Sequence, residues 1–590
     1  MTDSKHNKRS MMSRRRFIVV TASGLLATAC GSGGSGRRVD AADTGDAADT
    51  ADAGGPGDGG GSFDTGSIDA NVPTPEPNSP WQLAEGHYEG YFPQHVIYPR
   101  PDSETEAYAR HRHAYPGVLY EIPIGVQFGK WPYRYELLEG PAGARVVHET
   151  LEWNGDDAFI VPEGYGVVAW DVPHHAPAGP HTFRVRVYDQ DHGRAGDSFV
   201  DVTWTTAVGT SNFIFLDPIH GDDASADGSI NAPFREIAAL QDSGLAGNKI
   251  CYIRQTEPFD PDDSLFAGGY APSPPRQFSF GLDSEPKAYV AFPGEVVHIN
   301  TANQRAFAQS STINHDVFFD RIVTAYTNQN ARDRDNVRVI MHWSKSHRST
   351  FWRMGCMRAY GGNRKDDNHG FIWYWNDGGS VDDATGHTYL YSADCWMDRM
   401  NVDPGPDAPF EGVGANGPHL WETYTTNRTL AERHRITNSH IINNGFVIVK
   451  GSARDAEIRA CVSVEGNRGN YHIRGLGADS NGETRRVALC YNRTGGEEGR
   501  VAMGQAGTNP AYEDIIAYRN SCAGSIGASQ NPEAFSHAYN NITRTIAENV
   551  KEQEGNIEFG DNLQATFDDA MRLVGEARAA HLGLKGAEVA

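Results

Sequence analysis

The sequence predicts an all-β chain with two folded parts, a β-sandwich over residues 81–208 followed by a solenoid of stacked β-coils over 209–585. In the first part, short runs with apolar residues at every second position alternate with Gly, Pro and Asp turns, which is typical of a sandwich. In the second part, short apolar runs recur with Asn, Asp and Gly between them, as expected for coils of roughly 20–30 residues that bury their faces against one another. The 65 glycines among 590 residues also fit a turn-rich fold better than a helical bundle.

Residues 1–30 have the composition of an export signal. A basic start with three arginines (14–16) precedes an apolar run that is too short to span a bilayer. The arginine pair before Phe17 resembles a twin-arginine (Tat) signal, and residues 25–30 resemble a bacterial lipobox in which Cys30 is lipidated. These resemblances imply an exported protein held at the outer membrane or cell surface by a lipid on Cys30. The alternative is an ordinary signal peptide with an incidental cysteine, and hence a periplasmic or secreted protein.

Residues 31–80 form a predicted disordered, acidic linker. Asp recurs at every third position from 40 to 52 among Ala, Thr and Gly, and a Pro-rich stretch (73–80) follows. Such a segment has too little apolar surface to offset its ordering entropy, and its like charges keep it extended. It would hold the folded parts away from a membrane surface.

The charge of the chain limits its partners. A formal net charge of −24 argues against nucleic-acid binding, which needs a basic face to neutralise phosphates. It does not exclude a polyanionic polysaccharide, because a basic groove can lie on an acidic body.

The predicted sandwich resembles a known type of module. The segment 177–193 is similar to the late strands of bacterial immunoglobulin (Ig)-like modules attached to extracellular enzymes. Trp131, Trp153 and Trp170 could form a sugar-binding platform here, and the alternative is that at least one of them packs in the core.

The start of the solenoid carries the most specific motif in the chain. A short apolar strand at 213–216 runs into Asp, Gly and Ser, and a helix is expected from Pro233, with Phe234, Ile237, Ala238 and Leu240 on one face. Such a helix would shield the open first coil. The stretch resembles the opening of right-handed parallel β-helix proteins of the pectin-lyase-like class, and the residues that carry the resemblance are Leu216-Asp217-Pro218, Gly221, Asp223, Asp227-Gly228-Ser229, Pro233-Phe234 and Ile237.

The far end and the cysteines complete the expected architecture. Residues 565–584 have Phe567, Met571 and Val574 at helical spacing and could close the last coil or pack along the side. Six cysteines follow Cys30, an even number that permits disulfides in an exported protein. Their recurring contexts on the coils favour buried thiols instead, and the absence of a CxxC spacing in the sequence argues against a structural zinc site: Cys251, Cys356, Cys395, Cys461, Cys490 and Cys522.

Basic residues on neighbouring coils are the candidate catalytic groups. Lys450 ends the run FVIVK, and His472 and Arg474 follow about one coil later, so the same face is expected for all three. The arrangement resembles the alginate lyase and chondroitinase B group, in which a Lys on one coil precedes an Arg on the next. The resemblance implies a lyase in which a base removes the C5 proton of a uronic sugar and a cation neutralises its carboxylate. That group has calcium-binding carboxylates shortly before its Lys, whereas this chain has Asn443 and Gly445, so Ca²⁺ as a cofactor stays open.

An aromatic segment supplies the candidate sugar-binding residues. Trp373 and Trp375 fall on one side of a strand, with Tyr374 opposite, and could stack on sugar rings in a groove. The alternative is that these rings cover the apolar flank of a coil, and the candidate cations could likewise pair with Asp455 or Glu457.

The sequence therefore predicts an exported protein that binds or degrades polysaccharide, with β-elimination as the leading activity. A non-enzymatic glycan-binding or adhesin-type solenoid is the second hypothesis. A glycoside hydrolase is the third, because it needs two carboxylates across the scissile bond and the loops offer many: Asp366, Asp367, Asp377, Asp382, Asp383 and Asp394.

Overall fold

The computed structural model describes most residues from 92 to 558. It leaves out 1–91, 559–590 and a set of connections, of which the longest are 150–164, 190–198, 260–267, 327–339, 359–371, 377–384, 399–418, 475–483 and 504–511. The expected export signal, the lipidated Cys30, the linker and the C-terminal helix lie outside the described residues. No helix in the described part of the chain is both long and apolar enough to cross a membrane.

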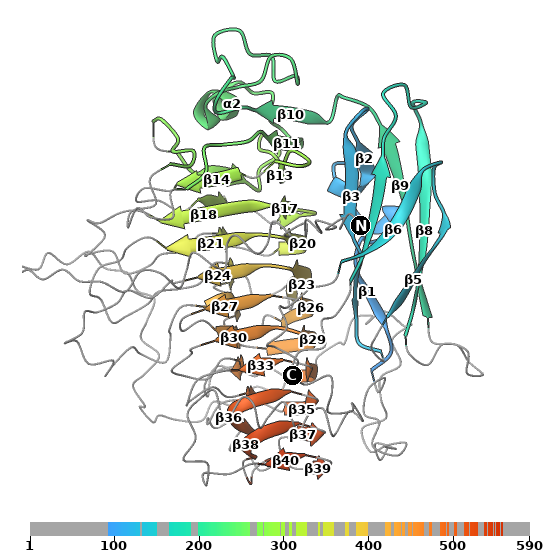
Figure 1. Cartoon of the computed structure of the whole chain (residues 1–590), viewed down its shortest axis with the longest axis vertical. Coiled ribbons are helices and arrows are strands. Elements are labelled where there is room, and N and C mark those ends of the chain that lie inside the picture. The colour runs from blue at the N-terminus through green and yellow to red at the C-terminus, as the bar shows by residue number, and fades with distance from the viewer. Residues whose placement is uncertain are drawn as a thin grey trace, which may run out of the picture. The chain divides into compact units, whose positions relative to one another are not determined.

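The first folded part is a β-sandwich of two sheets that share one core (Figure 1). Trp170, Phe183 and Trp204 are buried between the sheets, and the rings of Phe183 and Trp204 stack with centroids 5.1 Å apart. The core interpretation is thus confirmed for Trp170, while Trp131 and Trp153 lie outside the described residues. One sheet has the order β2 (His113–Ala114), β9 (Phe199–Val208), β8 (Pro180–Tyr188), β5 (Arg134–Glu139), and the other β3 (Leu119–Pro123), β7 (Tyr165–Asp171), β6 (Ala144–Glu149).

Smaller elements join the sandwich to the second part. Strand β1 (His95–Tyr98) pairs antiparallel with β4 (Gly125–Gln127). Two 3-10 turns, η1 (Asp102–Glu104) and η2 (Arg110–Arg112), connect β1 to β2.

The second part is a right-handed parallel β-helix, as the sequence predicts. Its strands form three ladders in which every pairing is parallel, and the chain visits the ladders in a fixed order, as in β23, β24 and β25. Parallel strands joined by crossover connections take the right hand in nearly all proteins. Figure 1 shows the resulting stack of coils.

The first ladder, called the first sheet below, runs the length of the β-helix. It consists of β10 (Phe213–Leu216), β11 (Ile250–Ile253), β13 (Ala288–Ala291), β17 (Phe318–Asp320), β20 (Ser346–Trp352), β23 (Thr385–Ala393), β26 (Leu430–Thr437), β29 (Ser452–Arg459), β32 (Thr484–Cys490), β35 (Tyr512–Tyr518), β37 (Ser536–Tyr539) and β39 (Glu552–Glu554). The short β16 (Asn314–His315) also pairs with β20.

The other two ladders meet at β36, which pairs with both β33 and β34. The second sheet consists of β14 (Val297–Asn300), β18 (Ile322–Tyr326), β21 (Gly355–Arg358), β24 (Trp396–Asp398), β27 (His440–Ile442), β30 (Val462–Val464), β33 (Arg493–Thr494), β36 (Ser521–Ala528), β38 (Ile542–Ile546) and β40 (Ile557–Glu558). The third sheet consists of β12 (Phe278–Phe280), β15 (Phe307–Gln309), β19 (Ile340–His342), β22 (Ile372–Asn376), β25 (His419–Thr425), β28 (Phe446–Lys450), β31 (Tyr471–Arg474) and β34 (Val501–Met503), and ends on β36.

The interior of the β-helix is built from side chains stacked coil on coil. In the first sheet in-register rows fill it, and within one of them the rings of Phe319 and Phe351 stack with centroids 5.1 Å apart. The five cysteines whose side chains are described are buried free thiols, so the thiol interpretation is confirmed for them: Cys251, Cys356, Cys395, Cys461 and Cys490. Burial raises the pKa of the Cys395 thiol to about 12, which removes it as a nucleophile.

A ladder of asparagines, which the sequence reasoning missed, lines the corner between the first and second sheets. The Oδ1 of Asn520 accepts hydrogen bonds from the backbone N–H and the Nδ2 of Asn492, at 3.0 and 3.1 Å. Asn541 and Asn556 repeat this on the next coils. Each amide therefore satisfies buried polar groups of the neighbouring coil, which fixes the register there.

The cap corrects one expectation. The helix α2 (Ile237–Asp242) begins at Ile237 rather than at Pro233, and Phe234 instead forms a parallel bridge with Leu216. The reason is that Asp223 Oδ1 accepts the N–H groups of Arg235 and Glu236, at 2.8 and 3.1 Å, and thereby holds this segment extended. The four apolar residues expected to cover the first coil are nevertheless buried: Phe234, Ile237, Ala238 and Leu240.

Candidate functional site

The outer face of the first sheet is not available to a substrate, because the sandwich covers it. Buried side chains of this face, such as Phe318, Tyr391 and Ile516, belong to the same apolar cluster as the sandwich core. The ring of Tyr98 on β1 lies 5.7 Å from that of Phe318 and 6.4 Å from that of Tyr391, between centroids. Gln127 Nε2 donates to the Asp455 carbonyl at 2.9 Å. We call this contact surface, between the sandwich with β1 and β4 on one side and the outer face of the first sheet on the other, the docking interface.

A buried ion cluster lies in the docking interface. Arg435, Glu457 and Arg459 are at most 2% exposed, and both guanidinium groups bond to the Glu457 carboxylate, that of Arg459 at 2.7 Å. The Phe128 N–H of the sandwich donates to Glu457 Oε2 at 2.9 Å. Burial raises the pKa of Glu457, but the charges of Arg435 and Arg459 outweigh it and hold this pKa below its usual value.

This cluster also bears on the alternative that Asp455 or Glu457 pairs with the candidate cations. Glu457 pairs with Arg435 and Arg459, and Asp455 pairs with Arg486 at 2.8 Å. These contacts give both acids other partners than the candidate cations.

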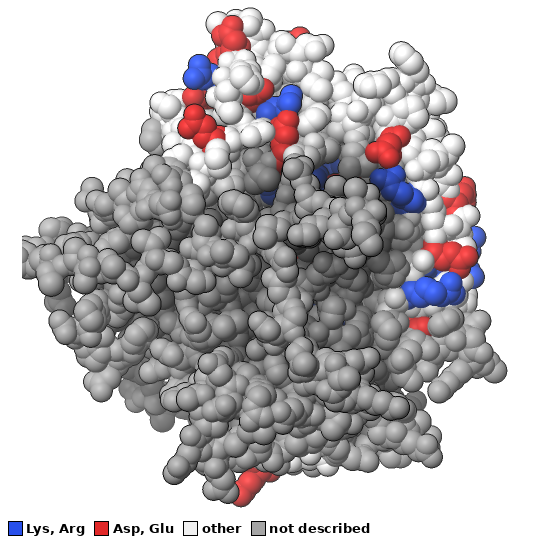
Figure 2. Space-filling view, viewed as in Figure 1, with Lys and Arg blue, Asp and Glu red and all other residues white. Residues whose placement is uncertain are grey.

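On the face seen in Figure 2, the surface of the cap and of the sandwich has no patch of a single charge sign, because the described basic and acidic residues are interspersed. Several form pairs, such as Arg186 with Asp201 at 2.7 Å and Arg254 with Glu295 at 2.6 Å. On this face, neither the cap nor the sandwich offers a basic surface for a long anionic sugar.

The third sheet aligns the residues predicted for catalysis and for sugar binding. One row of Cα partners runs from Trp375 on β22 through Tyr424 on β25 and Lys450 on β28 to Arg474 on β31. Lys450 and Arg474 are direct register partners, on adjacent coils. The row that is two residues earlier runs from Trp373 through Glu422 and Ile448 to His472. Five of the six predicted site residues thus fall in two parallel rows over four successive coils.

The interior row of this sheet fixes how the rows alternate. Phe278, Phe307 and Ile526 are fully buried in the core of the β-helix, and one register row joins them through Ile372 and Val447. The two site rows lie one and three residues later along each strand. Tyr374 lies two residues after the interior row, so by alternation it belongs to the same side of the strand as that row. Trp373 and Trp375 belong to the other side.

The sequence reasoning missed two members of these rows, Glu422 and Tyr424. Both lie on β25, between the coil of the tryptophans and the coil of Lys450. Their register depends on an irregularity between His419 and Trp421, where the pairing with β28 shifts. The alternation of WETYT over 421–425 was the available signal, but the sequence alone did not tie it to its neighbours.

The two rows together are about as long as a short stretch of sugar chain. Neighbouring strands lie about 4.8 Å apart, so four coils span roughly 14 Å, and positions two apart on a strand are separated by roughly 6.6 Å. The two rows together offer aromatic residues at one end and cations at the other, with one carboxylate between them.

Of the acids considered for hydrolysis, the structure describes only Asp394. Asp394 lies at the corner after β23 in a left-handed conformation (φ 54°), and its backbone N–H donates to the Thr437 carbonyl at 3.2 Å. The other acids considered for hydrolysis lie outside the described residues: Asp366, Asp367, Asp377, Asp382 and Asp383. The described residues include no group of three or more His, Cys, Asp or Glu side chains placed to hold a metal ion.

No family model and no curated protein matches this chain. Among solved structures, a GH136 lacto-N-biosidase from Eubacterium ramulus is 10% identical, over 59% of this chain and 67% of its own, with a TM-score of 0.30. The pectate lyase Pel9A is 9% identical, over 61% and 82%, with a TM-score of 0.28. At such scores these similarities carry no argument about function, which depends on the site alone.

Proposed function

We propose that this protein is an exported polysaccharide lyase that binds a uronic polysaccharide along the third sheet and cleaves it by β-elimination. The observation that carries the proposal is the register row from Trp375 through Tyr424 and Lys450 to Arg474, on a sheet whose face is not the one covered by the sandwich. By the alternation of side chains along a strand, both site rows belong to the outer face.

Each predicted catalytic residue has a role in that reaction. Arg474 neutralises the uronate carboxylate, which makes the proton on C5 removable. Lys450, as the neutral amine, takes this proton; the C4–C5 double bond forms and the C4–O4 glycosidic bond breaks. His472 donates a proton to the departing O4. The products are a new non-reducing end with an unsaturated uronide and a shortened chain.

The aromatic positions serve to bind the sugar chain. Trp373, Trp375 and Tyr424 precede the cations by one to three coils, and aromatic rings offer apolar faces to sugar rings. Between β18 and the last strand, the three longest connections, 327–339, 359–371 and 399–418, all lead into strands of the third sheet. Loops carried by a rigid scaffold are where binding residues concentrate, which supports this sheet as the substrate face.

The proposal includes the setting of the enzyme. The twin-arginine motif and Cys30 support export and lipid anchoring, with residues 31–80 as the spacer. The seven strands of the sandwich, in sheets of four and three, support an Ig-like module. The polysaccharide panel below tests Ca²⁺ as a cofactor.

A polysaccharide panel tests the proposal. The purified chain is incubated with uronic and neutral polysaccharides, with and without added Ca²⁺, and three quantities are measured: ultraviolet absorbance, reducing ends and retention on immobilised polysaccharide. We expect both absorbance and reducing ends to rise on a uronic substrate. Reducing ends without absorbance would identify a hydrolase instead, and retention without either would identify a glycan-binding protein.

A further inference from the structure

The docking interface contains two histidines that are enclosed among cations. His95 on β1 stacks on Tyr389 of β23 with ring centroids 5.9 Å apart, and its buried Nε2 has no hydrogen-bond partner among the described residues. Arg100, Arg433 and Arg486 are the charges that act on it most strongly.

His111 is buried more deeply than His95. It is 1% exposed, and neither ring nitrogen has a hydrogen-bond partner among the described residues. The edge of its ring contacts Tyr98, with centroids 5.5 Å apart, and Tyr98 itself packs on the first sheet. The charged groups that face His111 come from its own turn and from the β-helix: Arg110, Arg112, His113 and Arg348.

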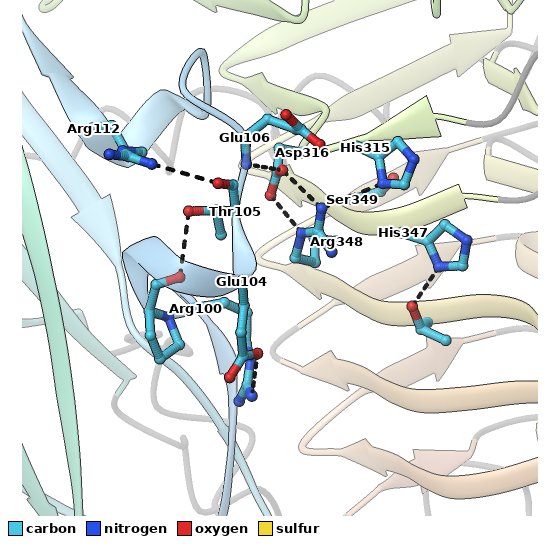
Figure 3. Close-up of polar contacts among 12 residues, drawn as sticks. Arg100, Glu104, Thr105, Glu106, Arg112, His315, Asp316, His347, Arg348 and Ser349 are labelled. Atoms are coloured by element: carbon cyan, nitrogen blue, oxygen red, sulfur yellow. Dashed lines mark hydrogen bonds and ion pairs between the residues drawn. The ribbon is translucent and has the colours of Figure 1, made fainter. Parts of the chain in front are cut away.

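The carboxylates of this region are already paired with cations, so they do not offer a new histidine charge a free partner. Figure 3 shows Asp316 bonded to both Arg348 and the Glu106 N–H, across the docking interface. The other pairs are Glu104 with Arg100 at 2.6 Å, Asp102 with Arg112 at 3.9 Å and Asp455 with Arg486 at 2.8 Å.

Docking therefore favours neutral histidines. Burial first, and then the surrounding charges, lower the pKa of both His95 and His111 from 6.5 to about 3. A released histidine with an ordinary pKa binds a proton between pH 6.5 and 3, so docking is fully favoured above pH 6.5 and weakens as the pH falls. At pH 5 a histidine that regains its ordinary pKa on release shifts the equilibrium toward release about thirtyfold; His111 keeps Arg110, Arg112 and His113 beside it after release, so its contribution is smaller.

Each of the two folded parts has buried apolar contacts of its own that stabilise its fold. The interior of the β-helix is an apolar cluster that contains no sandwich residue, and the sandwich has buried aromatic residues between its own sheets. The charges of Arg435 and Arg459 hold the pKa of Glu457 below its usual value despite its burial, so protonation of Glu457 is not the event that weakens docking first.

We propose that the docking interface is an acid-sensitive latch: protonation of His95 and His111 releases the sandwich from the first sheet while both parts stay folded. The latch would uncover the outer face of the first sheet, a surface that is closed at neutral pH. This inference does not depend on the proposed lyase activity.

Small-angle scattering of the full chain tests the latch. Between pH 7.5 and 5 we expect the radius of gyration to rise and an apolar dye to bind, while the far-ultraviolet circular dichroism keeps its β signature. The double variant H95Q/H111F cannot be charged at these positions and should open at a pH lower by roughly one unit or more. The control His298→Gln removes a half-buried histidine of β14 in the second sheet, outside the docking interface, and should open with the wild type.

Two results would overturn the latch: a wild-type chain whose scattering is unchanged at pH 5, or a double variant that opens at the wild-type pH. Should the double variant fail to fold, deuterium exchange at the C2 carbons of the wild-type histidines decides the matter. The latch requires His95 and His111 to titrate together with the opening, and independent titration would exclude it.

Discussion

Replacing Glu457 by Gln should be the most destabilising conservative change in the docking interface. Glu457 balances the charges of Arg435 and Arg459, and all three side chains are at most 2% exposed. Without that carboxylate two buried cations lack their counter-charge, which typically costs about 3–5 kcal/mol. We expect a lower urea midpoint and release of the sandwich at neutral pH, measured by unfolding and by scattering.

Two further variants serve as controls for this prediction. Asp171→Asn removes an ion pair with Arg145 whose side chains are 50% and 73% exposed, and such pairs contribute about 1 kcal/mol or less. Neutralising the whole cluster, as Arg435→Met, Glu457→Gln and Arg459→Met together, should recover most of the lost stability, because no uncompensated charge remains. If Glu457→Gln cost no more than Asp171→Asn, the buried cluster would not hold the docking interface.

Replacing Lys450 by Ala should give the largest loss of activity. Removal of the base lowers kcat by a factor of about 10²–10⁴, while KM changes little, since Lys450 acts on a proton rather than on sugar binding. Trp375→Ala, two positions earlier in the same row, should instead raise KM. The reaction is followed by the ultraviolet absorbance of the product.

The control for this series is Lys249→Ala, a lysine at the capped end of the first sheet whose Nζ donates to a backbone carbonyl. It should leave both kcat and KM unchanged. Equal activity of Lys450→Ala and the wild type would remove Lys450 from the mechanism, whatever the substrate.

Much of the fold could be predicted from the sequence because its signals are local. The alternation of apolar residues identified the strands, and the Asp-Gly-Ser turns with Phe234 identified the cap. The start of the helix was wrong because Asp223, more than ten residues away in sequence, holds Arg235 and Glu236 extended. No pattern within one strand reports such a contact.

The docking interface could not be predicted for a related reason. Phe318 and Tyr391 look like ordinary strand residues, and only the structure shows that Tyr98, beside the sandwich, packs on them. Lys450 and Arg474 were expected on one face from their spacing, and their backbone register agrees with this. Tyr424 and Glu422 were missed because a register irregularity separates their strand from simple counting.

Hydroxyl-radical footprinting of the Lys450→Ala variant, with and without a bound uronic oligosaccharide, tests the central claim most directly. We expect the sugar to protect Trp373, Trp375 and Tyr424 on the third sheet and to leave the exposed Phe199 of the sandwich unchanged. Protection of the sandwich, with no change at these three aromatic residues, would contradict this claim.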